Sequence, residues 1–163
     1  MLPKTILVVD DEVANLQKQQ SLIGRYRVNN YIAVASLSLD LREGSGFLAN
    51  GGMPFPYMIR QGEVEQIAVA GLPLGLMEEG EYEQTPLHLA PGDTLVLASD
   101  GATDATNRSG EMYDAKRLEE SMRSHFSLPT AAFAHSLFED ITRFAGDTEL
   151  RDDVTILAIR RLR

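Results

Sequence analysis

The sequence predicts an α+β fold, in which an antiparallel β-sheet of short strands packs against helices. Three observations favour this class. Short apolar or alternating segments separated by tight turns occupy residues 31–98, two segments with helical periodicity follow, and one more apolar strand lies near the end of the chain. A run of antiparallel strands followed by helices is typical of α+β proteins.

Composition limits the classes of function. The chain has 163 residues, 44% of them hydrophobic and 24% charged, which is ordinary for a globular domain. Its net charge of −9 argues against nucleic acid and anionic membrane surfaces as partners, because both attract clusters of Lys and Arg. The absence of cysteine excludes disulfides and thiolate chemistry. Without a long apolar segment or a signal-peptide layout, we expect a cytoplasmic protein.

The first 24 residues predict one strand and one helix. Residues 5–9 form a short apolar run rich in β-branched side chains, which indicates a buried strand. Three acidic residues follow, at 10–12, where a helix N-terminus favours negative charge. The helical spacing ends near Gly24, a residue type common after helix ends.

The middle of the chain predicts an antiparallel meander. Residues 31–41 alternate between apolar and polar side chains, which predicts a half-buried strand. Turn residues at 43–46 lead into a return strand, so the two strands form a hairpin. Further strands are predicted at residues 57–60 and 64–69.

A deeply buried strand follows a strand at the edge of the sheet. Pro86 places the strand around Leu87 and Leu89 at an edge, because proline cannot donate a ladder hydrogen bond. After a turn at residues 91–93, the segment 94–98 is apolar on both faces and therefore predicts a strand covered on both sides.

Two helices and a final strand complete the predicted order. The first helix spans residues 113–124, and the second begins near residues 127–129 and ends at Gly146. The apolar stripe of the second helix consists of Phe133, Leu137, Ile141 and Phe144. The last strand covers residues 154–159.

Two acidic junctions between buried strands and loops could carry chemistry. Asp100 directly follows the buried segment 94–98, and Asp152 with Asp153 directly precedes the last strand. A carboxylate at the end of a buried strand is held at the rim of the sheet, and Gly101 lets a ligand approach the backbone closely. Hard cations such as Mg²⁺ and Mn²⁺ prefer carboxylate and water oxygens. The pattern is compatible with a divalent metal site.

The same residues also have a purely structural interpretation. Asp100 and Asp104 could cap a short helix, and residues 152–153 could form a turn. Local composition alone does not decide between the two.

Longer blocks in a fixed order favour the metal site. They read L-A-N-G-G-M-P-F-P-Y-M-I-R from residue 48, G-L-P-L-G-L from 71, P-G-D-T-L-V-L-A-S-D-G-A-T-D-A-T-N from 91 and D-D-V-T-I-L-A-I from 152. In this order and spacing, the blocks resemble PPM-type serine/threonine protein phosphatases of the SpoIIE-like branch, over roughly residues 31–163. The fold implied is part of the PPM phosphatase β-sandwich.

The resemblance implies a metal-dependent phosphoserine/phosphothreonine protein phosphatase domain of bacterial signalling, of the sigma-factor regulatory type. Its cofactor would be Mn²⁺ or Mg²⁺, binuclear in the family, and its substrate a phosphorylated protein such as an anti-sigma-factor antagonist. By position, Asp100 and Asp152 match metal ligands, and Gly101, Asp153 and Thr155 match supporting positions. The resemblance assigns no further catalytic side chain.

The sequence departs from the family pattern in two places. Met53 stands where the family's N-A-G-H-x-P-P loop has histidine, so no polar role carries over there. The G-D-x-x-D and D-x-x-G-H-G blocks, which bear further metal ligands, do not occur. We therefore expect residues 25–163 to be the C-terminal portion of a phosphatase domain with at most a partial metal centre. The alternatives are a non-catalytic, phosphatase-like protein-binding module in a response-regulator pathway and a remnant without a function of its own.

Residues 1–24 resemble something else, the opening of a response-regulator receiver domain. The string I-L-V-V-D-D-E at residues 6–12 resembles the first strand of receivers and the acidic pair that follows it, and in receivers this acidic pair binds Mg²⁺. A working receiver is not expected, because no lysine lies between Lys18 and Lys116 and no phosphoacceptor aspartate stands at the required distance. A further hypothesis is that Asp10 or Asp11 replaces a missing metal ligand of the phosphatase domain.

Overall fold

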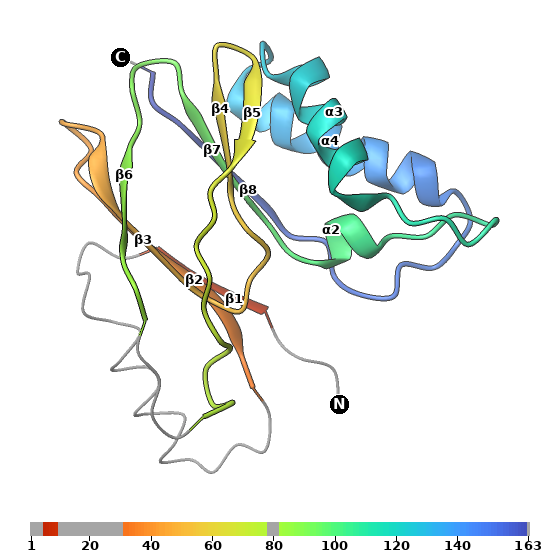
Figure 1. The fold of residues 1–163 in the computed structure, drawn as a ribbon. Helices are drawn as coiled ribbons and strands as arrows, with labels where there is room; N and C mark the ends of the chain where they lie inside the picture. The colour runs from red at the N-terminus through yellow and green to blue at the C-terminus, as the bar shows by residue number, and fades with distance from the viewer. Residues whose placement is uncertain (1–4, 10–30, 78–81, 163) are drawn as a thin grey trace. The chain divides into compact units, whose positions relative to one another are not determined.

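The computed structural model describes residues 5–9, 31–77 and 82–162 and divides into two compact units. The first unit comprises Met1–Phe55 and Ala68–His88, and the second comprises Pro56–Ile67 and Leu89–Arg163 (Figure 1). The helix predicted between residues 10 and 24 lies outside the described residues. Within the described part of the chain, no helix is long and apolar enough to cross a membrane.

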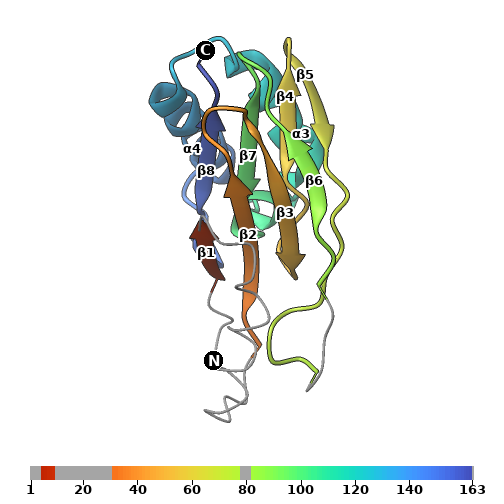
Figure 2. The ribbon, with the colours of Figure 1, turned by 90° about the vertical axis from the view of Figure 1, so that its left-hand side faces the viewer.

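The first unit contains a four-stranded sheet in the order β1-β2-β3-β6, which Figure 2 shows side by side. Its strands are β1 (Thr5–Val9), β2 (Ala33–Leu39), β3 (Ser45–Gly51) and β6 (Thr85–His88). β1 pairs parallel to β2, and the other pairs are antiparallel. The predicted hairpin is confirmed by β2 and β3, and Pro86 lies in an edge strand as expected.

The predicted alternation of β2 is only partly correct. Residues 34–37 are buried on both faces of the strand, so the segment is more deeply covered than a half-buried pattern suggests. Leu41, which continues the alternation in sequence, is 85% exposed because the chain has already entered the turn. The Asp40 carboxylate accepts hydrogen bonds from the backbone N–H groups of Arg42 and Glu43 and thereby ends the strand.

The second unit contains the sheet β5-β4-β7-β8, in which every pair is antiparallel. Its strands are β4 (Tyr57–Arg60), β5 (Glu63–Gln66), β7 (Thr94–Ala98) and β8 (Ile156–Arg160). All five residues of β7 are buried, which confirms the strand predicted to be covered on both faces. The prediction that these strands form one antiparallel meander is wrong, because β3 and β4 belong to different sheets. Pro54 and Pro56 separate them and cannot donate ladder hydrogen bonds.

Helices of the second unit pack on its sheet. They are α2 (Gly101–Asp104), α3 (Asp114–His125) and α4 (Thr130–Ala145). Phe133, Leu137 and Ile141 of the predicted stripe are fully buried, and Phe144 packs partly buried against the same core. The core joins these side chains to residues of β4 and β7, including Tyr57, Ile59, Val96 and Ala98. Sheets whose strand pairs are antiparallel except for β1–β2, together with packed helices, confirm the α+β class.

Candidate functional site

The two acidic junctions meet where β7 ends and β8 begins. The last paired residues of these strands are Ala98 and Ile156. Beyond that pair, the Ser99 N–H donates to the Thr155 carbonyl at 2.9 Å, and the Thr155 N–H donates to Ser99 Oγ at 2.9 Å. The Ser99 hydroxyl in turn donates to the Asp153 carbonyl at 2.9 Å. We call these three hydrogen bonds the Ser99 bridge.

Gly101 brings the backbones of the two junctions into direct contact. A Cβ atom built on Gly101 would lie 2.5 Å from the Asp153 carbonyl oxygen and 3.2 Å from that of Asp152. A side chain would therefore have to push the Asp152–Asp153 backbone away. Asp100 stands between Ser99 and Gly101, and both of these neighbours contact the acidic loop before β8.

Each candidate carboxylate is oriented by one backbone N–H group. Asp100 Oδ1 accepts from the Gly101 N–H at 3.0 Å, and Asp152 Oδ1 accepts from the Asp153 N–H at 2.9 Å. Asp100 is exposed and Asp152 is partly buried. Neither carboxylate forms an ion pair with any lysine, arginine or histidine that the structure describes. The structural interpretation of Asp100 is also correct, since Asp100 is the N-cap of α2.

The other two residues predicted to support the site act through their backbones. Asp153 and Thr155 are both exposed, and their contacts to Ser99 use the Asp153 carbonyl and the Thr155 N–H and carbonyl. Ser99 stands in the same predicted block as Asp100, but the sequence assigns it no role of its own. The only hint in the sequence is a hydroxyl residue at the end of an otherwise apolar strand.

The donor set fits one hard divalent cation better than two. Two carboxylates from separate segments, with water completing the coordination, suit Mg²⁺ or Mn²⁺. No group of three or more His, Asp or Glu side chains suitable for a metal ion occurs within residues 31–77 and 82–162. Asp10 and Asp11, the proposed replacement ligands, lie outside the described residues.

Comparison with known proteins identifies the family. The model of the Stage II sporulation protein E (SpoIIE) family matches residues 8–162. The chain belongs to the SpoIIE family. The family resemblance predicted from the sequence blocks is thereby confirmed, whereas the receiver-like start of the chain stays a prediction.

Curated relatives of this SpoIIE-family chain are longer than the chain itself. The phosphoserine phosphatase RsbU of Bacillus subtilis (strain 168) is 26% identical over 127 residues, which cover 78% of this chain and 37% of RsbU. Stage II sporulation protein E of the same organism is 24% identical over 154 residues, covering 93% of this chain and 18% of that protein. The chain therefore spans well under half the length of these relatives.

Solved structures show the same fold. The SiaA-PP2C domain of Pseudomonas aeruginosa superposes with a TM-score of 0.80 at 24% identity, covering 92% of this chain and 60% of that one. The structure of the RsbU and RsbW domains of Rv1364c from Mycobacterium tuberculosis superposes with a TM-score of 0.76 at 21% identity. The match covers 90% of this chain and 41% of that one. The manganese-presoaked phosphatase domain of SpoIIE from Bacillus subtilis superposes with a TM-score of 0.66 at 20% identity. The match covers 88% of this chain and 63% of that one. The SpoIIE-family chain thus has the fold of a large part of the PP2C phosphatase domains.

The Asn50 block of the SpoIIE-family chain is a structural clamp in the first unit. The buried Asn50 amide donates to the carbonyls of Met53 and Val69 at 2.8 Å each, and its oxygen accepts from the Met53 N–H at 2.9 Å. Gly71 packs so closely on the Asn50 carbonyl that a Cβ atom would lie 1.6 Å from its oxygen. Met53, which stands where the family pattern has histidine, is 8% exposed.

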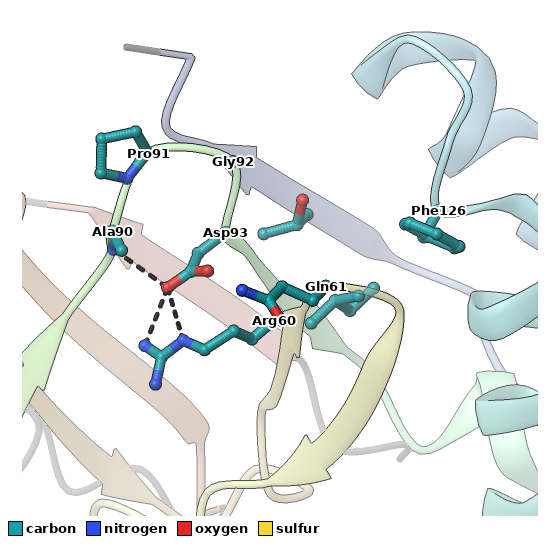
Figure 3. A pocket seen from close by; sticks show the side chains of 9 residues that line it. Arg60, Gln61, Ala90, Pro91, Gly92, Asp93 and Phe126 are labelled. Carbon is teal, nitrogen blue, oxygen red and sulfur yellow. Dashed lines mark hydrogen bonds and ion pairs between the residues drawn. The ribbon is translucent and has the colours of Figure 1, made fainter.

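A pocket of about 230 Å³ lies at the other end of β7 (Figure 3). It is lined by residues of the β4–β5 turn, the turn before β7 and Phe126. The buried carboxylate in this lining, that of Asp93, is engaged in hydrogen bonds within the protein. Asp93 Oδ2 accepts from Arg60 Nε at 3.0 Å, Arg60 Nη2 at 2.8 Å and the Ala90 N–H at 2.9 Å. These bonds hold the turn before β7 against β4 and place this carboxylate in a structural role.

A further carboxylate joins α3 to α4. Asp140 Oδ2 accepts from Ser121 Oγ at 2.7 Å and lies 3.0 Å from His125 Nε2, while Oδ1 lies 2.6 Å from Arg143 Nη1. Burial by itself would raise the pKa of Asp140, but the hydrogen bonds from Ser121, His125 and Arg143 outweigh it and lower the pKa below its ordinary value. This network gives the buried hydroxyl of Ser121 its hydrogen-bond partner and joins α3 to α4.

Proposed function

We propose that this chain is part of a phosphoserine/phosphothreonine protein phosphatase domain that uses Mn²⁺ or Mg²⁺ and acts in cytoplasmic signalling. The single observation that carries the proposal is the meeting of the Asp100 and Asp152 segments through the Ser99 bridge and Gly101. Two carboxylates that have no basic partner among the described residues, at one rim of a sheet, are suited to a hard cation.

Asp100 and Asp152 are the proposed metal ligands, and the chain's own backbone orients them. The N–H groups of Gly101 and Asp153 each hold one oxygen of these carboxylates, which leaves the second oxygen of each without a hydrogen bond from a described residue. When bound, a divalent ion would supply the chemistry of metal-assisted hydrolysis, namely activation of water and stabilisation of charge on the phosphoryl oxygens. A second ion would need ligands beyond those of the described residues.

The relatives support the proposed substrate class. RsbU carries the name phosphoserine phosphatase, and RsbU and RsbW domains occur together in the Rv1364c structure. We therefore propose a phosphorylated protein of a sigma-factor pathway, such as an anti-sigma-factor antagonist, as the substrate.

Phosphate release from a phosphoserine peptide tests the proposal. Release should require Mn²⁺ or Mg²⁺, and both Asp100→Asn and Asp152→Asn should lower it by more than about a hundredfold, the upper range for losing an outer-shell partner of a metal ligand. Asp104→Asn is the matched control, because Asp104 is an exposed aspartate one turn further along α2. Its activity should stay within about twofold of the parent, in the range of ordinary surface substitutions.

The same measurement separates the proposal from the alternative. A folded chain without turnover at any concentration of Mn²⁺ or Mg²⁺ would reject the phosphatase for this chain. If the metal also fails to raise its melting temperature, the non-catalytic binding module is the better description, since a ligand that binds only the native state must stabilise it.

A further inference from the structure

We propose that Ser99 is a positioning residue whose hydroxyl sets the place of the Asp152 loop relative to Asp100 and thereby the affinity for the metal. The inference deepens the proposed function and rests on it. It assigns a role to a side chain that touches no ligand but links the two segments that carry the proposed ligands.

Ser99 stands where the backbone ladder can no longer continue. Its own carbonyl accepts the Ala102 N–H at 3.1 Å, because the chain turns into α2 directly after β7. That carbonyl is therefore directed into α2, while the next N–H group on the β8 side, that of Thr155, needs an acceptor. Ser99 Oγ accepts this N–H at 2.9 Å and so replaces the missing rung of the ladder.

The hydroxyl also donates, which fixes the loop from a second direction. Ser99 Oγ donates to the Asp153 carbonyl at 2.9 Å, and that same oxygen packs against Gly101. Ser99 is 2% exposed, so water has little access to the hydroxyl. The two peptide units that flank Val154, close after Asp152, are thus held by one buried side chain that is donor and acceptor at once.

Few side chains can make both bonds. A hydroxyl offers one donor and two acceptor lone pairs, alanine offers neither, and a thiol is a weak donor and a weak acceptor. Threonine retains the hydroxyl. Because outer-shell partners of metal ligands influence affinity by orienting those ligands, removal of the hydroxyl should affect metal binding more than removal of a comparable hydroxyl elsewhere.

Calorimetric titration of Mn²⁺ into the full chain tests this inference, with Ser121→Ala as the matched control. Ser121 is also buried in the second unit and also donates its hydroxyl to an oxygen, but it serves the α3–α4 pair. Ser99→Ala should weaken the Mn²⁺ affinity by about tenfold or more, whereas Ser99→Thr should stay close to the parent. Ser121→Ala should lower the melting temperature without changing the affinity.

Amide hydrogen exchange gives a readout that needs no metal. The Thr155 N–H should lose protection in Ser99→Ala and keep it in Ser121→Ala, because only the first variant removes its acceptor. If Ser99→Ala does not fold, Ser99→Cys takes its place. Because a thiol is a weak donor and a weak acceptor, the Mn²⁺ affinity of Ser99→Cys should lie below that of the parent.

The possible failures are distinguishable. A parent that binds no Mn²⁺ would overturn the proposed function and this inference with it, whatever the exchange of Thr155 shows. A parent that binds Mn²⁺, together with a folded Ser99→Ala or Ser99→Cys of unchanged affinity, would overturn the positioning role alone.

Discussion

The two ends of β7 use aspartate in opposite ways. Before the strand, the side chain of Asp93 is 5% exposed and its carboxylate is neutralised by Arg60. After the strand, Asp100 is exposed, accepts one backbone N–H and has no basic partner among the described residues. The buried, paired carboxylate of Asp93 holds structure, whereas the carboxylates at the other end are oriented by backbone N–H groups and are the metal ligands of the proposed function. The difference suggests that stability and metal binding of the second unit can be changed separately.

Substitution of two glycines, one at each end of β7, should separate metal affinity from stability most strongly. Gly101→Ala places a Cβ atom 2.5 Å from the Asp153 carbonyl oxygen, so the loop of Asp152 must move. We expect the Mn²⁺ affinity to fall by about a hundredfold, at the upper end of outer-shell effects. The measurement is a calorimetric titration of the folded variant.

Gly92→Ala is the matched control for that substitution. Gly92 has φ +94 and no atom within 4 Å of a built Cβ, so alanine strains only the turn, at a cost of about 1 to 2 kcal/mol. Its Mn²⁺ affinity should equal that of the parent. Equal losses of affinity in both glycine variants would show that the two ends of β7 are not independent.

A smaller effect, on stability alone, is expected from Asp93→Asn. The substitution removes the charge that faces Arg60 and weakens the hydrogen bonds that hold the turn, which should lower the free energy of unfolding by about 2 kcal/mol. The value stays below that of a fully buried ion pair because the Arg60 side chain is half exposed. Denaturant unfolding measures it, and a change in Mn²⁺ affinity of more than a few-fold would contradict the separation of roles.

Much of the fold could be predicted because its patterns are local. The apolar stripe of α4 and the doubly apolar β7 are each determined by a short stretch of side chains, and both are found in the structure. The partition into two sheets could not be predicted in this way. Strand pairing depends on contacts between segments far apart in sequence, and the prolines between β3 and β4 indicate only a break, not which sheet follows.

The candidate site shows the same limit. Asp100 and Asp152 could be singled out because acidic residues border buried strands and match a family block. Ser99 could not, because its importance comes from a carbonyl that turns into α2 and from partners more than fifty positions away. The Asn50 clamp likewise depends on the distant carbonyl of Val69.

The most direct test of the account is a double-mutant cycle for Mn²⁺ affinity with Asp100→Asn, Asp152→Asn and the double variant, all measured by calorimetry. If both carboxylates hold the same ion, each single substitution should weaken binding by about tenfold or more, and the double variant should be weaker by clearly less than the product of the two losses. A coupling free energy of about 1 kcal/mol or more would then be found, as expected for residues that share a partner. Unchanged affinity in either single variant, or losses that multiply independently, would contradict a shared metal site.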